Sequence, residues 1–427
     1  MHGAERRVVR SCAARTASKE RAAQPDGPVS LRREKQVLAL IIRQRAGVSL
    51  NTHSFAPMIQ GFHHVLLFCR MCLRGLGLGT SALPKPRLQI SLAGGVYTLL
   101  HHMPRYRLSI AYDGTAFCGW QRQHMPADVA RTHGHDVPTD AATDRFELRS
   151  VQGLVQRAIR DVTLEEVNLI GASRTDAGVH ARAQTAAFTT TDDRRGPADE
   201  RFAEALNSRL PDDIVIRSAA RTHDAFDPIT DCIAKGYSYT FHTGRARPLW
   251  DRPYVNHIRE DLNASAMAAA AAMFIGRHDF AAFAAAGHGR ASTIRTVLHC
   301  AVRAFRSAHD EPRIAITVAA DGFLWNMVRI IAGTLMDVGR SRITLDRVRE
   351  ALASGDRRTA GPTVPPTGLC LEWGAYDEAD LAKHTGPLNV APELLDMARA
   401  TAAERKRQNA EFRAARDTTD ADIEESA

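Results

Sequence analysis

The chain has 427 residues, with 44% hydrophobic and 24% charged residues, which is typical of a soluble globular protein long enough for two or three domains. Its formal charge of +8 comes mostly from residues 1–103, so the net charge does not by itself indicate nucleic-acid binding by the rest. The seven cysteines are odd in number and scattered, which favours reduced thiols in a cytoplasmic protein over a disulfide framework. No run of about 18 uncharged apolar residues occurs, so we expect no membrane segment.

Residues 1–103 differ in character from the remainder. They are rich in Arg and Ala, poor in acidic residues, and show no lasting helical or strand periodicity. Cys69 and Cys72 form a CxxC, but no second pair follows at zinc-finger spacing, so we assign no metal site there. We expect the folded protein to begin near Met103, with the basic extension disordered or absent from the mature protein.

The pattern becomes regular after Met103. A strand is predicted over 106–112 and ends at the turn pair Asp113-Gly114. A polar loop over 124–144 follows, and Ser150 is predicted to cap a helix whose apolar face begins at Val151. The remaining elements predicted in this half are strands over 167–172, 184–190 and 213–219, and a helix over 201–210.

A second half repeats this mixture of elements. The predicted elements are strands over 235–241, 296–302 and 313–319, and helices over 262–274, 326–339 and 345–354, the last closed by Gly355. The tail 377–427 is charged and lacks a lasting apolar stripe, so a frayed helix or disorder is expected. The sequence therefore predicts an α+β protein with two similar halves, 104–222 and 223–376.

One stretch, GASRTDAGVHA (Gly171–Ala181), places an arginine and an aspartate directly after an apolar run. A turn is one interpretation, because Asp176 can accept hydrogen bonds from nearby amides and Gly178 can adopt a positive φ. A reactive carboxylate is the other. This stretch alone does not separate the two.

Seven blocks of the sequence together resemble the TruA family of tRNA pseudouridine synthases. They occur in the family's order between Met103 and Tyr376, and their combination is far more specific than any single block. The blocks are YDGTAFCGWQ (Tyr112–Gln121), SVQG (Ser150–Gly153), GASRTDAGVHA, KGYSY around Tyr237, GRHDFAAF (Gly276–Phe283), DGFLWNMVRIIAGTLMDVG (Asp321–Gly339) and AGPTVPPTGL (Ala360–Leu369).

The resemblance implies a role for each matching residue. Asp176 would be the catalytic carboxylate, Arg174 would help to turn the target nucleotide out of its stack, Arg329 would pair with the carboxylate, and Tyr237 would stack on the uracil. Candidate substrate-binding residues are, besides Tyr237 and Arg174, Asp113, Gln121 and Lys235.

The resemblance also implies a fold and a substrate. It implies two RNA-recognition-like halves, whose antiparallel or mixed sheets join around a central cleft. It further implies a homodimer that modifies uridines 38 to 40 in the anticodon stem-loop of tRNA.

The chemistry of that reaction suits such a set of residues. Converting uridine to pseudouridine breaks an N1–C1′ bond and forms a C5–C1′ bond without redox change or an added group, so no cofactor and no metal are expected. The carboxylate must be ionised to act as nucleophile or base, and a nearby guanidinium favours that form. Extruding the base costs a few kcal/mol, which stacking on an aromatic ring, worth about 1 to 3 kcal/mol, can offset. Attack at C1′, addition to C6 and removal of the 2′ proton all remain open.

Simpler interpretations compete at individual positions. Arg329 could extend to the surface, and Tyr237 could be an ordinary strand aromatic. His180 is predicted to be a structural hydrogen-bonding residue, and Asp113 to be a turn former first. Trp120 and Trp325 are predicted to lie in the core rather than to stack on bases, although Trp325, next to the MVR block, is expected to lie nearer the site.

The whole chain also has a competing interpretation. A non-catalytic RNA-binding module of two sheet-and-helix halves is the main alternative, but it does not explain an acid placed beside an arginine, since a carboxylate repels phosphate. With a body near charge balance, RNA affinity would depend on clustered cations such as Arg122, Lys235, Arg245 and Arg247.

Overall fold

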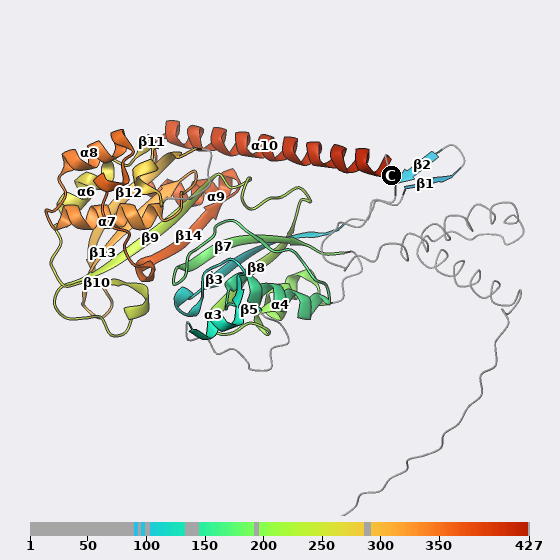
Figure 1. Ribbon diagram of the computed structural model, residues 1–427, viewed down its shortest axis with the longest axis horizontal. Coiled ribbons are helices and arrows are strands. Elements are labelled where there is room, and N and C mark those ends of the chain that lie inside the picture. Colours follow the sequence, from blue (N-terminus) through green and yellow to red (C-terminus); the bar gives the residue numbers. More distant parts are fainter. Residues whose placement is uncertain are drawn as a thin grey trace, which may run out of the picture. The chain divides into compact units, whose positions relative to one another are not determined.

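The structure is a computed structural model that describes residues 89–92, 95–98, 103–132, 145–191, 196–285 and 292–425 (Figure 1). The predictions for residues 1–103, including the CxxC, therefore lie almost wholly outside the described residues. Within that range, β1 (Gln89–Leu92) and β2 (Gly95–Thr98) pair as an antiparallel hairpin, where the sequence predicts no element. Among the described residues, no helix combines the length and the apolar character needed to cross a membrane.

A ten-stranded mixed sheet organises the described chain, with the strand order β11-β12-β13-β9-β14-β7-β3-β8 and with β6 and β10 paired beside it. The N-terminal half contributes β3 (Arg105–Tyr112), β6 (Ile170–Gly171), β7 (His180–Thr189) and β8 (Ile214–Thr222). The C-terminal half contributes β9 (Ala234–Thr243), β10 (Asn256–Ile258), β11 (Gly276–Asp279), β12 (Ile294–Arg306), β13 (Pro312–Ala320) and β14 (Leu369–Ala375). The predicted α+β class is confirmed.

Strand β14 joins the sheets of the two halves. It pairs antiparallel with β9 and parallel with β7, where Cys370 lies opposite His180 and Leu371 opposite Ala181. This strand is not predicted from the sequence, because its residues follow a stretch rich in Pro and Gly. The joint therefore depends on tertiary pairing rather than on local periodicity.

Helices cover one face of this sheet and enclose the main core. The strand residues Leu108, Phe188 and Tyr239 share this core with Val155 and Ile331 from two of the helices. The helices are α4 (Val151–Thr163), α5 (Phe202–Asn207), α6 (Ala264–Ala272), α7 (Met327–Gly339) and α8 (Leu345–Ser354).

The helix ends follow the predicted signals. Ser150 accepts a hydrogen bond from the Gly153 amide, and Gly355 closes α8 at a φ of 67°. The predicted apolar face of α4 is buried at Val151 and Val155.

The tail after Tyr376 forms two helices, α9 (Glu378–Thr385) and α10 (Pro392–Glu425). They take part in a second cluster that contains Leu381 and Ala398 together with the strand residues Ala319 and Ala375. Neighbours of Ala319 along β13 belong to the main core, so this cluster lies on the opposite face of the sheet. The tail, expected to be a frayed helix or disordered, is helical over Glu378–Thr385 and Pro392–Glu425 and packs through a few small apolar contacts, without a long apolar stripe.

The segment that follows the GWQ block differs from its prediction. The loop predicted over 124–144 is wrong at its start, where β4 (His124–Pro126) and α3 (Ala127–Thr132) form, and β4 pairs with β5 (Arg145–Glu147). Ala127 and Ala130 form a small separate cluster, against which Met125 and Phe146 pack. The strand predicted over 167–172 is shorter, since β6 contains only two residues.

Candidate active site

The backbone of the GASRTDAGVHA stretch is a turn between β6 and β7, anchored to the GWQ segment. Asp176 forms an isolated antiparallel bridge with Gly119, and the Trp120 amide donates to the Thr175 carbonyl at 3.0 Å. Gly178 adopts a φ of 77°, as predicted. The turn interpretation is thus correct for the backbone, and it leaves the Asp176 side chain to be explained.

Two donors from the other half of the protein hold the Asp176 carboxylate. Arg329 Nη1 donates to Oδ2 at 3.1 Å, and Trp325 Nε1 donates to Oδ1 at 3.1 Å. The Asp176 side chain is 31% exposed and that of Arg329 16%. Each carboxylate oxygen is therefore engaged, yet the group still reaches the surface at the place where the two halves meet.

Arg329 is itself held in position by its own half. Its Nε donates to the Val364 carbonyl at 2.8 Å, and its Nη1 donates to Asn326 Oδ1 at 2.8 Å. Asn326 precedes α7 in a left-handed conformation with a φ of 60°. Arg329 therefore does not extend to the surface, and that alternative is wrong.

Tyr237 lies on β9 and is only 9% exposed. Its ring meets Phe323 edge-on, with 5.0 Å between the ring centroids. Burial, together with the negative charge of Asp176 and against a hydrogen bond with Ser173, raises the pKa of Tyr237 to about 12. The side chain packs as a strand aromatic does, in one core with Tyr239 and Phe241, and its hydroxyl stays protonated within electrostatic reach of Asp176.

The other sequence-predicted site residues differ in their exposure and in their hydrogen bonds. Arg174 and Gln121 are exposed, and neither has a hydrogen bond or ion pair within the described part of the chain. Lys235 donates from Nζ to the Ala172 carbonyl at 2.5 Å. Its amine therefore links β9 to the residue that follows β6, before the turn.

Asp113 is a turn former, as predicted, and it also joins two segments. Its carboxylate accepts from the Thr115 amide at 3.0 Å and from the Tyr254 hydroxyl at 2.7 Å. Burial alone would raise the pKa of Asp113, but the hydrogen bonds from Thr115 and Tyr254, with a contribution from His180, lower it below its ordinary value.

His180 is a buried structural residue, as predicted. Its Nδ1 accepts from the Gly114 amide at 3.0 Å, and its Nε2 lies 3.0 Å from the Pro253 carbonyl and 3.2 Å from that of Thr367. Nδ1 also lies 3.2 Å from a carboxylate oxygen of Asp113. The ring therefore links the start of β7 to two segments of the C-terminal half.

Several groups that surround Asp176 were not predicted from the sequence. Trp325 was expected in the core, and this is wrong: it is 51% exposed and donates to the carboxylate. Trp120 is buried, as expected. Phe323, which contacts Tyr237, and Asn326, which contacts Arg329, were not singled out. The sequence pointed to them only in that they belong to the same block as Arg329 and precede it by a few residues.

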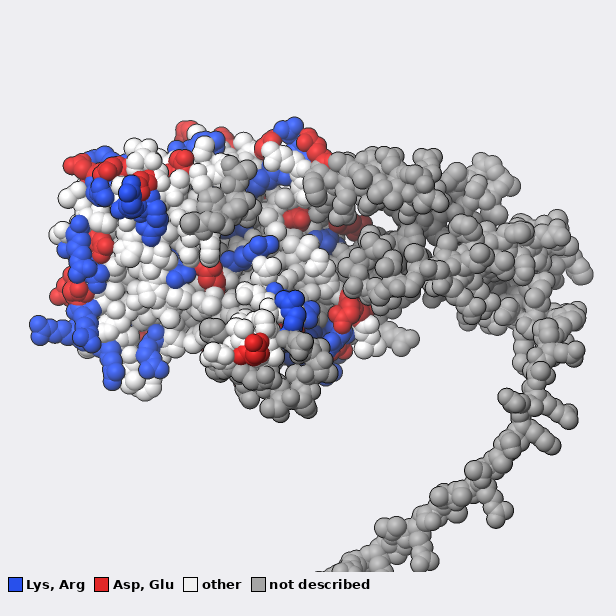
Figure 2. All heavy atoms as spheres, viewed as in Figure 1, with Lys and Arg blue, Asp and Glu red and all other residues white. Residues whose placement is uncertain are grey.

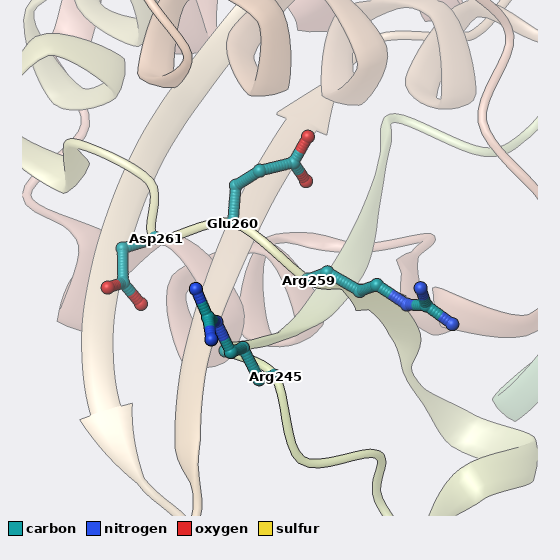
Figure 3. A pocket seen from close by; sticks show the side chains of 5 residues that line it. Arg245, Arg259, Glu260 and Asp261 are labelled. Carbon is teal, nitrogen blue, oxygen red and sulfur yellow. The ribbon is translucent and has the colours of Figure 1, made fainter.

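A pocket of about 570 Å³ lies away from these residues, lined by Gly244, Arg245, Arg259, Glu260 and Asp261 (Figure 3). Glu260 pairs with Arg340 at 2.9 Å. Arg245 and Arg259 are exposed, and the carboxylates beside them make this pocket mixed in charge. Among the described residues, no three His, Cys, Asp or Glu side chains gather as a metal site.

The fold and the paired carboxylate define a class of protein, and comparison with known families identifies it. The sequence profile described as tRNA pseudouridine synthase matches residues 108–228 and 270–377, together just over half of the chain. These ranges contain Asp176, Trp325 and Arg329. The chain belongs to the TruA family of tRNA pseudouridine synthases, which are isomerases that act on tRNA.

Individual relatives agree with this assignment. The chain is 38% identical over 270 residues to tRNA pseudouridine synthase A 2 of Clostridium perfringens, covering 63% of this chain and 98% of the relative. It is 40% identical over 269 residues to tRNA pseudouridine synthase A of Pelobacter propionicus, with the same coverage. It is 42% identical over 269 residues to tRNA pseudouridine synthase A of a Thermoanaerobacter species, again covering 63% and 98%.

Proposed function

We propose that this chain converts uridine to pseudouridine in the anticodon stem-loop of tRNA, at positions 38 to 40, with Asp176 as the catalytic carboxylate. The observation that carries the proposal is the placement of Asp176. The carboxylate stands at the meeting of the two halves, accepts one hydrogen bond on each oxygen, and is still 31% exposed. A carboxylate that forms a turn accepts from local amides, as Asp227 does from the amides of Ile229 and Thr230.

The surrounding residues supply what the reaction requires. Arg329 places a positive charge 3.1 Å from the carboxylate, which offsets part of the cost of desolvating that group under a bound base. Trp325 fixes the direction of the second oxygen, so that the carboxylate presents one orientation to the nucleotide. Tyr237, protonated at neutral pH, offers its ring to the uracil.

Arg174 is suited to the step that turns the nucleotide out. It is exposed next to Asp176 in the chain, and no described side chain competes for its guanidinium. An arginine in this state can enter the space that the base leaves, which lowers the cost of unstacking because the neighbouring bases keep a stacking partner.

Larger assembly follows from the same proposal. We propose a homodimer in the cytoplasm, in which one tRNA contacts both subunits, because the family resemblance implies this arrangement. Such an arrangement would enlarge a basic surface that is modest in one chain.

The substitution Asp176→Asn tests the proposal. It keeps the size of the side chain but removes its charge, so pseudouridine formation in a tRNA transcript should vanish while tRNA binding persists. Binding should be equal or tighter, because a negative charge near phosphates is removed. Single-turnover release of tritium from [5-³H]uridine tRNA and filter binding measure the two quantities.

Asp161→Asn is the matched control, since Asp161 is exposed and pairs with Arg160 on the surface. It should retain wild-type turnover. If Asp176→Asn turns over at the wild-type rate, Asp176 is only a turn residue and the proposed catalytic role fails. If the wild-type protein binds tRNA but forms no pseudouridine, the non-catalytic RNA-binding module is the better description.

A further inference from the structure

The long helix α10 lies outside the part of the chain that the family match explains. The match ends at residue 377, whereas α10 spans Pro392–Glu425. The first turns of α10 are nevertheless packed on the sheet: Ala398 is fully buried and Leu394 and Leu395 are partly buried in the second cluster. A segment beyond the shared core is therefore built into the same folded unit.

One side chain of α10 reaches past this cluster into the body of the protein. Arg405 donates from Nη2 to the Cys232 carbonyl at 2.7 Å and from Nη1 to the Asp321 carbonyl at 3.1 Å. Cys232 lies just before β9 and Asp321 just after β13. These strands are paired, with Lys235 opposite Ala320 at this end. The guanidinium thus bridges the two chain segments where they meet the strand pair.

Each bridged carbonyl leads directly to residues around Asp176. From Cys232 the chain enters β9, which carries Tyr237. From Asp321 it enters a segment without helix or strand, which carries Phe323, Trp325 and Asn326 before Arg329 in α7. Without regular backbone pairing, the direction of this segment depends on how its ends are held.

The start of that segment is held from two directions. From within the sheet, Asp321 donates from its amide to the Thr296 carbonyl at 3.0 Å and accepts the Thr296 amide at 3.1 Å. Arg405 supplies the contact from outside the sheet. Its Nε is buried without a hydrogen-bond partner among the described residues, which indicates that the side chain is enclosed and not displayed to solvent.

We propose that Arg405 is a positioning residue for the reaction: by clamping the carbonyls of Cys232 and Asp321, α10 keeps Trp325 and Arg329 aligned with Asp176. This inference rests on the proposed function of Asp176. Arg405 does not itself contact the carboxylate, so it acts through the segment Asp321–Asn326. The expected signature is a loss of rate without a loss of tRNA affinity, since misplacing a reacting group by about 1 Å can cost about 100-fold.

The substitution Arg405→Met keeps an unbranched apolar stem but removes both donors. We expect the single-turnover rate at saturating tRNA to fall by about 10-fold to 100-fold, with the tRNA dissociation constant unchanged within about 2-fold. Arg405→Lys can reach only one of the two carbonyls and should fall between Arg405→Met and the wild type. Arg407→Met is the control on the same helix, because Arg407 is exposed and pairs with Glu404 and Glu411 on the surface of α10.

A double-mutant cycle shows whether the effect passes through the segment. In a Trp325→Phe background the carboxylate already lacks the donor that the segment carries, so Arg405→Met should cost less than it does in the wild type. Fully additive losses would overturn the proposal. So would a rate equal to that of Arg407→Met, or a parallel loss of rate, affinity and melting temperature, which marks a general structural role.

A failure of the proposed role of Arg405 can be distinguished from a failure of the proposed catalytic role of Asp176. If Asp176→Asn remains active, the catalytic assignment fails first. If Asp176→Asn is inactive and Arg405→Met has the wild-type rate, only the role of α10 is refuted.

Discussion

At the scale of single residues, the contact of Trp325 with Asp176 is a feature of the site that the sequence did not predict. Its indole N–H donates to a carboxylate oxygen, and hydrogen bonds to charged groups contribute about 1.5 to 3 kcal/mol. Half of the side chain is exposed, so the same ring that contacts Asp176 also forms part of the surface beside it, which an incoming nucleotide would meet under the proposed function. Trp325 therefore contributes both to the orientation of the Asp176 carboxylate and to the shape of the surface around it.

Trp325→Phe should lower the single-turnover rate by about 10-fold or more, because it keeps an aromatic ring but leaves Oδ1 of Asp176 without its donor. Trp250→Phe is the control, since Trp250 is 71% exposed on a different loop. Quenched-flow measurement at saturating tRNA gives the rates. Equal rates for the two variants would mean that the indole contact does not orient the carboxylate during the reaction.

The pairing of Asp176 with Arg329 could be predicted from the sequence, and the contact with Trp325 could not. The pair is implied by two blocks that match a known family. Whether a tryptophan beside such a block is buried or exposed depends on the backbone of a segment without regular structure. The left-handed conformation of Asn326, which helps to set that backbone, has no pattern in a single sequence.

At the scale of elements, the end of β13 combines a fold-stabilising contact with an electrostatic cost. Asp321 is 2% exposed and ties β13 to β12 through Thr296. Burial raises the pKa of the Asp321 carboxyl, although the Thr296 hydrogen bonds and the charges of Arg405 and Arg295 oppose the increase. The ionised carboxylate is therefore held at a site that favours its neutral form.

The pH dependence of stability should show this cost. The folded state binds the Asp321 proton more tightly than the unfolded state, so its stabilising effect is complete below the ordinary pKa of 3.8. It is lost as the pH rises through the raised value. Relative to Asp321→Asn, the wild type should thus lose unfolding free energy over this window and then level off.

Urea titrations of both proteins from acidic to neutral pH measure that difference. Asp356→Asn provides the opposite control, because the hydrogen bonds from Arg358 lower the pKa of the Asp356 carboxyl to about 2. A wild-type to Asp321→Asn difference that does not vary with pH would contradict the argument.

Elements with their own end signals were predictable, and those defined by tertiary contacts were not. Helices α4 and α8 have capping residues and apolar faces that a single sequence reveals. Strand β14 and helix α10 lack such signals. Their burial depends on β7, β9 and a few alanines that are far away in the sequence.

At the scale of the whole molecule, cations are unevenly available to RNA. Lys and Arg side chains gather over the loop that joins β9 to β10 (Figure 2), where Arg245 and Arg247 are exposed. Neither has a hydrogen bond or ion pair within the described residues. Arg122, by contrast, pairs with Glu147 at 3.0 Å. A guanidinium that is already paired displaces fewer counterions when it meets a phosphate.

The salt dependence of tRNA binding should distinguish these residues. Arg245→Gln and Arg247→Gln should each reduce the slope of log affinity against log salt by about 0.7 to 0.9 for each phosphate that the variant no longer neutralises. Arg122→Gln should change it less, since Glu147 already neutralises that charge. Filter binding over a range of KCl concentrations measures the slopes. Similar slopes for all three variants, or none that differs from the wild type, would contradict this assignment.

The charge pair between Asp176 and Arg329 also reports on assembly, because its members come from opposite halves. Either half folded alone would present one half of an ion pair and an uncovered end of a sheet, since β14 of one half completes the row of strands begun by β7 of the other. A nascent chain therefore exposes the unpaired edge of β7 until β14 (Leu369–Ala375) has been synthesised. Asp176 and Arg329 come from the same two halves that β14 and β7 join, so completion of the sheet and formation of the ion pair both depend on the docking of these halves.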